Sequence, residues 1–303
     1  MRRVLFTALL VLAGLGAGLQ FWRLKSVSEG DGRQAPGTVP DTRLGQSSGT
    51  SPGILPRGTA GQALPTGDGS KSKEIADLVD CRGRDLKPHE KELLYGLLRD
   101  PKQPSDLEPL HLYVLKNHIL NRLRNEPEAS IEVETVMVEM FENRDQPAVL
   151  RDYAIQHLAC WYADGHPSER GLRALTQALS EIDTSIAGTA LLGLADLADS
   201  YPEVSADRVA QAAYDIAASP ATGELSKIAA LRVGGKLKID ALRETARELA
   251  QTGSTIPLRI AAIATLGDLP DPQALSFLQS LEGGPDPRLA FAARSALDRA
   301  VQR

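Results

Sequence analysis

The sequence predicts an all-α protein made of stacked helix pairs, and three observations lead to this prediction. The 303 residues are 42% hydrophobic but only 4% aromatic, a composition that suits closely packed helices rich in Leu and Ala better than a β-sheet core. Residues 258–281 have the pattern of a helix, a Pro-containing turn and a second helix, and looser copies of the first helix recur along the chain. Long strand patterns are absent from the sequence.

Residues 1–25 are predicted to form a signal anchor, which is an uncleaved membrane-spanning helix. The apolar run from Val4 is roughly 19 residues long, close to the length that spans a bilayer, and Phe21 and Trp22 would lie at the membrane interface. The alternative is a cleaved signal peptide with its cleavage site near the Gly-Ala-Gly at 16–18. The positive-inside rule favours a cytoplasmic amino terminus, so the rest of the chain is expected outside the cytoplasm, in the periplasm if the cell is Gram-negative.

Residues 26–70 are predicted to be a disordered linker, because their 45 positions contain ten Gly, six Ser and five Pro and no aromatic residue. The remaining residues, 71–303, are predicted to form the helical domain. The first 25 residues carry four positive charges and the linker a net charge of −1, so the formal charge of −5 leaves −8 for the domain. A domain this acidic argues against nucleic-acid binding, which depends on clustered Lys and Arg.

Helical periodicity begins at residue 71 and continues to the carboxyl terminus. Five helices are expected in the first part, at 73–80, 88–99, 107–125, 131–143 and 148–163, separated by Gly83 and by prolines at 101–104, 127 and 147. The run from Ile131 also alternates like a strand. Its flanks are helical, however, and Val133, Val136 and Met140 also fit one helical face, so it is predicted to be a helix.

The repeat is visible as a register of helix starts at Leu150, Ile186, Leu225, Leu258 and Leu289, spaced 36, 39, 33 and 31 residues apart. Each interval is long enough for two short helices. Four residues after every start stands an alanine, as expected where helices approach closely: Ala154, Ala190, Ala229, Ala262 and Ala293. Partner helices are expected in between, at 171–182, 205–218, 241–251 and 272–281.

Two segments of this repeat resemble a known family. Residues 258–272 (LRIAAIATLGDLPDP) and 287–297 (PRLAFAARSAL) are similar to HEAT repeats, in particular the short HEAT-like repeats named after phycobilisome lyases. The resemblance is clear over 222–303, fair over 146–221 and weak over 71–145. It implies a right-handed α-solenoid of stacked helix pairs whose inner face usually binds the partner, and it supplies no catalytic residues. The divergent segment 71–145 is expected to be a differently built cap or a specialised binding end.

One group of candidate site residues lies on the expected helix 148–163 and just after it: Tyr153, His157, Cys160, Trp161, Tyr162 and His166. His157 and Cys160 are three residues apart and could share a helix face as metal ligands do. The competing interpretation is ordinary variation within the repeat, since no paired C-x-x-C motif occurs. Cys160 could form a disulfide with Cys81 in an exported domain, or both could be buried thiols.

A second group is a band of charged residues on two partner helices: Arg243, Glu244, Arg247 and Glu248, together with Arg208 and Gln211 on the preceding partner helix. Such a band is typical of a solvated helix face. Because repeats place equivalent positions side by side, it could also line a groove that receives an acidic peptide.

The sequence favours a membrane-tethered, non-enzymatic scaffold or adaptor that binds another protein through its solenoid surface. The residues expected to contact the partner are Tyr153, His157, Trp161, Arg208, Gln211, Arg243 and Arg247. The expected partners are an unidentified protein and the membrane, through the amino-terminal helix. No catalytic residue, metal, cofactor, nucleic acid or small-molecule substrate is expected. The alternative is a cofactor-handling or lyase-like HEAT protein that takes a tetrapyrrole or a metal, with a DNA-binding HEAT-like module as a third interpretation.

Overall fold

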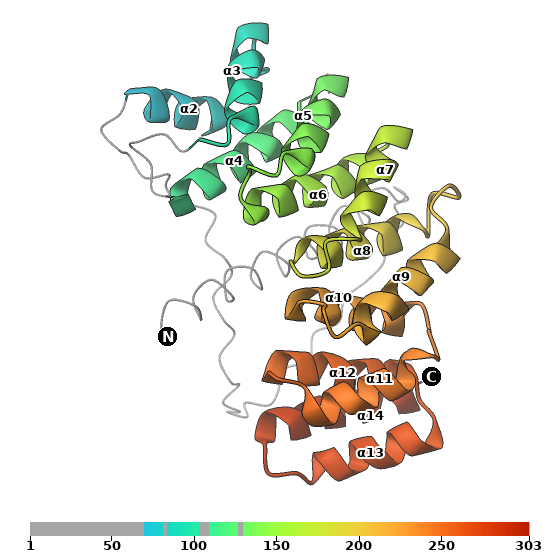
Figure 1. The fold of residues 1–303 in the computed structure, drawn as a ribbon. Coiled ribbons are helices and arrows are strands. Elements are labelled where there is room, and N and C mark those ends of the chain that lie inside the picture. Colours follow the sequence, from blue (N-terminus) through green and yellow to red (C-terminus); the bar gives the residue numbers. More distant parts are fainter. Residues whose placement is uncertain (1–69, 81–83, 103–108, 127–129, 303) are drawn as a thin grey trace, which may run out of the picture. The chain divides into compact units, whose positions relative to one another are not determined.

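The computed structural model describes residues 70–80, 84–102, 109–126 and 130–302, all within one compact unit, Gly61–Arg303. These residues form thirteen helices and no strand, so the prediction of an all-α fold is confirmed for the part described (Figure 1). The predicted signal anchor, 1–25, lies outside the described residues. So does the predicted linker, 26–70, apart from Ser70, which begins the first described helix.

The described helices are α2 (Ser70–Asp80), α3 (Pro88–Arg99), α4 (Pro109–Arg124), α5 (Ile131–Glu142), α6 (Ala148–Ala163), α7 (Glu169–Ala178), α8 (Ile186–Leu197), α9 (Ala206–Ala218), α10 (Glu224–Lys236), α11 (Leu242–Thr252), α12 (Ile256–Asp268), α13 (Pro272–Glu282) and α14 (Pro287–Val301). Helices α3 and α6 have the predicted bounds. The run from Ile131 is a helix, as predicted, and α12 and α13 form the predicted pair at 258–281.

The predicted membrane localisation is contradicted as far as the described residues go. None of their helices is long and apolar enough to cross a lipid bilayer. This finding corrects the prediction of a single-pass, membrane-anchored protein with an extracytoplasmic repeat domain.

The even-numbered helices from α4 to α14 form a layer in which each helix packs against the next. The odd-numbered helices flank this layer, and α5, α9, α11 and α13 pack against α6, α10, α12 and α14, respectively. Figure 1 shows these pairs following one another along the unit, from α3 at one end to the pair α13 and α14 at the other. This arrangement of the described helices is consistent with an α-solenoid-like fold.

Small residues allow the even-numbered helices to approach one another closely. The five alanines of the repeat register are all at most 5% exposed. A Cβ atom added at Gly193 in α8 would lie 2.6 Å from Cβ of Ala159 in α6, and one added at Gly267 in α12 would lie 2.7 Å from Cβ of Ala296 in α14. At these distances the space beside each glycine can hold a hydrogen atom but not a methyl group. Close packing of the even-numbered helices therefore requires glycine at both positions.

Two arginines at equivalent register positions connect the layers. Arg151 follows the helix start Leu150, and its Nε donates to the Phe141 carbonyl at the end of α5 at 2.7 Å. Arg259 follows Leu258 in the same way and donates to the Ala250 carbonyl near the end of α11 at 2.8 Å. Each guanidinium satisfies a carbonyl that has no partner within its own helix and complements the negative end of the helix dipole.

Replacement of Gly267 by alanine tests the close approach of α12 and α14. The new Cβ would lie 2.7 Å from Cβ and 2.8 Å from Cα of Ala296, so we expect the Gly267→Ala variant to lose about 1–3 kcal/mol of unfolding free energy. The matched control is Gly96→Ala in α3, where an added Cβ atom would have no atom of another side chain or element within 4 Å. Alanine should stabilise the helix at this position by about 0.5–1 kcal/mol. Urea denaturation measures both, and equal stability of the Gly267→Ala variant and the wild type would contradict this packing.

Candidate functional site

His157, the central residue of the first predicted group, is a core residue. It is 4% exposed, its Nδ1 lies 3.0 Å from Nη1 of Arg124, and its Nε2 lies 2.8 Å from Oδ1 of Asn117. Because a guanidinium can only donate, Nδ1 accepts and Nε2 carries the proton that is donated to Asn117. Burial, and then the charge of Arg124, lower the pKa of His157 to about 3. His157 is therefore a neutral imidazole whose two nitrogens both have protein partners.

The neighbours of His157 on α6 are also mostly buried. Trp161 is 3% exposed and stacks on His166 with ring centroids 3.8 Å apart. Tyr153 is partly buried, and burial raises the pKa of its hydroxyl. Cys160 has a free thiol whose pKa is raised mainly by burial, while Cys81 lies outside the described residues. The described part of the chain contains no group of three or more side chains placed to hold a metal ion.

The second predicted group lies on α9 and α11, which contact each other, but its charges are used locally. Arg247 pairs with Glu244 on its own helix at 2.5 Å, and Gln211 donates to Asp215 at 2.9 Å. Arg243 binds the Leu269 carbonyl at 3.1 Å and two nearby aspartates. Arg208 is exposed at the start of α9. These side chains therefore do not point towards one common site that could bind an anion.

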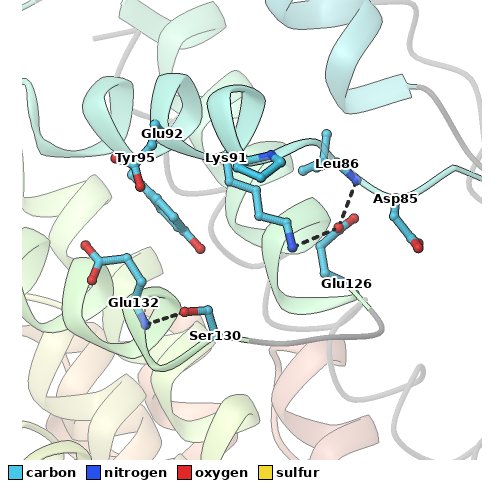
Figure 2. A pocket seen from close by; sticks show the side chains of 9 residues that line it. Asp85, Leu86, Lys91, Glu92, Tyr95, Glu126, Ser130 and Glu132 are labelled. Atoms are coloured by element: carbon cyan, nitrogen blue, oxygen red, sulfur yellow. Dashed lines mark hydrogen bonds and ion pairs between the residues drawn. The ribbon is translucent and has the colours of Figure 1, made fainter.

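A cavity of about 430 Å³ opens instead in the divergent amino-terminal part, between α3, the end of α4 and the start of α5 (Figure 2). Its lining contains more acidic than basic side chains and a few apolar ones: Asp85, Leu86, Pro88, Lys91, Glu92, Tyr95, Glu126, Ser130 and Glu132. The α3 residues 88, 91, 92 and 95 share one helix face because they are three, four and seven positions apart. The volume is in the range of small-molecule sites.

Contacts at the starts of the two helices hold the walls of this cavity. Glu90, in the first turn of α3, accepts from the Lys87 backbone N–H at 2.8 Å and pairs with the Arg84 guanidinium at 2.7 Å. Those hydrogen bonds lower the pKa of Glu90 to about 2. Ser130 caps α5 by accepting from the Glu132 N–H at 3.2 Å. The segments that carry the lining residues are thus fixed by local capping.

Of the four carboxylates that line the cavity, two are already engaged. Glu126 accepts from the Leu86 N–H at 3.0 Å, is paired with Arg122 and lies 3.4 Å from the Lys91 Nζ. Glu132 accepts a hydrogen bond from Arg99 through one of its oxygens, Oε1. Asp85 and Glu92 are exposed, and neither forms an ion pair with another described residue.

Tyr95 is a buried side chain with an open polar end. The residue is 3% exposed, yet its hydroxyl makes no hydrogen bond to any residue in the described ranges. Figure 2 shows this hydroxyl inside the cavity, between Glu132 on one side and Lys91 on the other. Burial raises the pKa of Tyr95, and the negative charges of Glu132, Glu92 and Glu126 raise it further. The hydroxyl oxygen itself is accessible to solvent through the cavity, so water can satisfy it and a ligand that enters the cavity can take the place of that water.

The combination suits a positively charged organic group. Leu86, Pro88 and the ring of Tyr95 provide apolar wall, while Glu92 and the Tyr95 hydroxyl provide acceptors for a cation. The surrounding carboxylates would repel an anion. No sequence motif indicated this site, because its acidic residues are spread over 48 positions of the chain and meet only in the fold.

The similarity of this chain to known proteins is limited. No protein-family model matches the chain. No curated protein matches it either. Among solved structures, human deoxyhypusine hydroxylase in complex with glycerol is similar at 16% sequence identity over 71% of this chain and 97% of that chain, with a TM-score of 0.29. A TM-score of this size does not establish a common fold, and it assigns no activity to this chain.

The function predicted from the sequence nevertheless needs correction. The predicted membrane-tethered, non-enzymatic scaffold or adaptor is withdrawn: no comparison supports it, and the similar structure is that of an enzyme, at a likeness too weak to assign either role to this chain. The residues assigned to that scaffold, from Tyr153 to Arg247, lie on α6, α9 and α11, away from the lining of the cavity.

The neutral state of His157 predicts a pH dependence of stability. Its pKa is about 3 in the folded protein and near 6.5 when unfolded, so below pH 6.5 only the unfolded state takes up this proton. The stabilisation is complete above pH 6.5 and is lost as the pH falls towards 3. Urea denaturation at pH 7.5 and 5 should show that the wild type loses about 2 kcal/mol more than a His157→Gln variant. The exposed His166→Gln variant should behave like the wild type, and equal losses in all three proteins would contradict the assignment.

Proposed function

We propose that this domain binds an organic cation in the cavity between α3, α4 and α5. The observation that carries the proposal is Tyr95, a buried residue whose hydroxyl faces the cavity without a hydrogen-bond partner among the described residues, in a lining that also contains the exposed carboxylate of Glu92. The proposal departs from the expectation that the protein takes no small-molecule ligand.

The physical basis is the balance between desolvation and new contacts. A cation that enters the cavity loses water, and this costs free energy unless acceptors replace the lost hydrogen bonds. The Tyr95 hydroxyl and the carboxylates of Glu92 and Glu132 can act as those acceptors, and the ring of Tyr95 and Leu86 can cover the apolar part of the ligand. The side chain of Lys91 already places an ammonium group inside this lining, which supports the same chemistry.

We also propose that the helix pairs from α5 onward are HEAT-like repeats stacked in a right-handed solenoid. The alanine register, the equivalent roles of Arg151 and Arg259, and the packing of each even-numbered helix on the next support this. In this arrangement the cavity lies at the end of the stack, where the repeat pattern is weakest.

Isothermal titration calorimetry of the full chain with n-pentylammonium, guanidinium and choline tests cation binding. We expect saturable binding of at least one cation that weakens as salt is added, because the attraction is partly screened. Loss of one charge-assisted contact in Glu92→Gln, or of the hydroxyl in Tyr95→Phe, should weaken binding on the order of tenfold.

The matched control is Glu248→Gln, which removes an exposed carboxylate from α11 and should leave the affinity unchanged. Tyr95→Phe keeps the ring, so its thermal unfolding midpoint should stay close to that of the wild type. The proposal is wrong if no cation binds saturably, or if Glu248→Gln weakens binding as much as Glu92→Gln does.

A further inference from the structure

We propose, building on cation binding in this cavity, that the ligand is a primary alkylammonium group and that Lys91 is its internal competitor. Lys91 is itself a primary ammonium on an alkyl stem, and its side chain lies within the lining of the cavity (Figure 2). It therefore occupies the cavity with the same chemical group that we assign to the ligand.

The contact that holds Lys91 in place is weak. Its Nζ lies 3.4 Å from Oε2 of Glu126, beyond the range of about 2.7–2.9 Å for a hydrogen bond between an ammonium and a carboxylate. In the described part of the chain this is the only polar contact of the Lys91 ammonium, and its side chain remains 22% exposed. A long, partly exposed contact of this kind costs little to break.

Glu126 does not depend on Lys91. The carboxylate side chain is 2% exposed, but it keeps the Leu86 N–H at 3.0 Å and the Arg122 guanidinium when Lys91 moves away. Breaking a buried ion pair is expensive when it leaves a charge without a partner, and that penalty does not arise here. Lys91 can therefore leave the cavity without destabilising its wall.

The acceptors on the opposite side of the cavity suit a primary ammonium. Such a group has three N–H donors, and the Tyr95 hydroxyl, the Glu92 carboxylate and the second oxygen of Glu132 provide three acceptors. A quaternary ammonium has no N–H to donate. A guanidinium carries its N–H donors in one plane, and Glu132 and Glu139 already bind one such group, that of Arg99. The number and type of acceptors in the lining thus favour a primary ammonium among organic cations.

Two sources share this chemistry, a free alkylamine and the side chain of a lysine in a polypeptide. Both place an ammonium at the end of an unbranched apolar stem, which Leu86 and Pro88 can cover. n-Pentylammonium and Nα-acetyl-lysine N-methylamide are the two probes that separate these sources. Tighter binding of the lysine derivative identifies a polypeptide ligand, and tighter or equal binding of n-pentylammonium identifies a free amine.

Calorimetry with the full-length Lys91→Gln variant tests the competition. Removing the Lys91 ammonium group should raise the affinity for n-pentylammonium on the order of tenfold. The ligand then neither has to displace this positive charge nor is repelled by it. Lys227→Gln removes the same charge from α10 and should leave the affinity unchanged. Both variants should unfold at the temperature of the wild type, since Glu126 keeps its other partners.

The class of ligand is tested in the same titrations. N,N,N-trimethylpentylammonium has the same charge and stem without N–H donors, and we expect it to bind at least tenfold more weakly than n-pentylammonium to the Lys91→Gln variant. Equal affinities of these two probes, or an affinity of Lys91→Gln equal to or below that of the wild type, would overturn the inference while leaving cation binding intact. Absence of any binding to either protein would instead refute the proposed function itself.

Discussion

Close contact between the even-numbered helices is the constraint on which the rest of the fold depends. Gly193 and Gly267 face alanines of the adjacent helix at distances that exclude a methyl group, and the register alanines are buried along the same layer. The flanking helices α5, α9, α11 and α13 pack along this layer, and hydrogen bonds at helix ends add to that packing. Arg151 and Arg259, which bind carbonyls of α5 and α11, illustrate how such contacts recur at equivalent positions.

The amino-terminal helices are held together differently, and the cavity results from that difference. Lys116 on α4 is 2% exposed and donates from Nζ to the Asp100 carbonyl at 2.5 Å, and Gln146 donates to the Leu98 carbonyl at 2.9 Å. Glu126, at the other end of α3, accepts from the Leu86 N–H. These buried polar contacts fix the ends of α3 and α4 without the close packing of small residues, and a space lined by acidic side chains remains beside α3.

Much of the fold could be predicted from the sequence, because helix periodicity and breaking residues are local signals. The bounds of α3 and α6 follow from Pro88 and Pro147, and the register alanines are buried as their spacing indicates. The burial of His157 was not predicted, because the same register position holds the exposed Arg232 in one repeat and the buried Thr265 in another. The cavity was not predictable, since the open hydroxyl of Tyr95 is a property of the tertiary packing and leaves no trace in local sequence.

If the cavity beside α3 is a cation site, as we propose, a crystal of the full chain soaked with n-pentylammonium should hold the ligand there. We expect electron density for the ligand in the cavity, with the ammonium nitrogen within hydrogen-bonding distance of the Tyr95 hydroxyl and the Glu92 carboxylate and with Lys91 displaced from Glu126. A saturated crystal in which the ligand binds elsewhere, with the cavity unoccupied and Lys91 unmoved, would contradict this proposal.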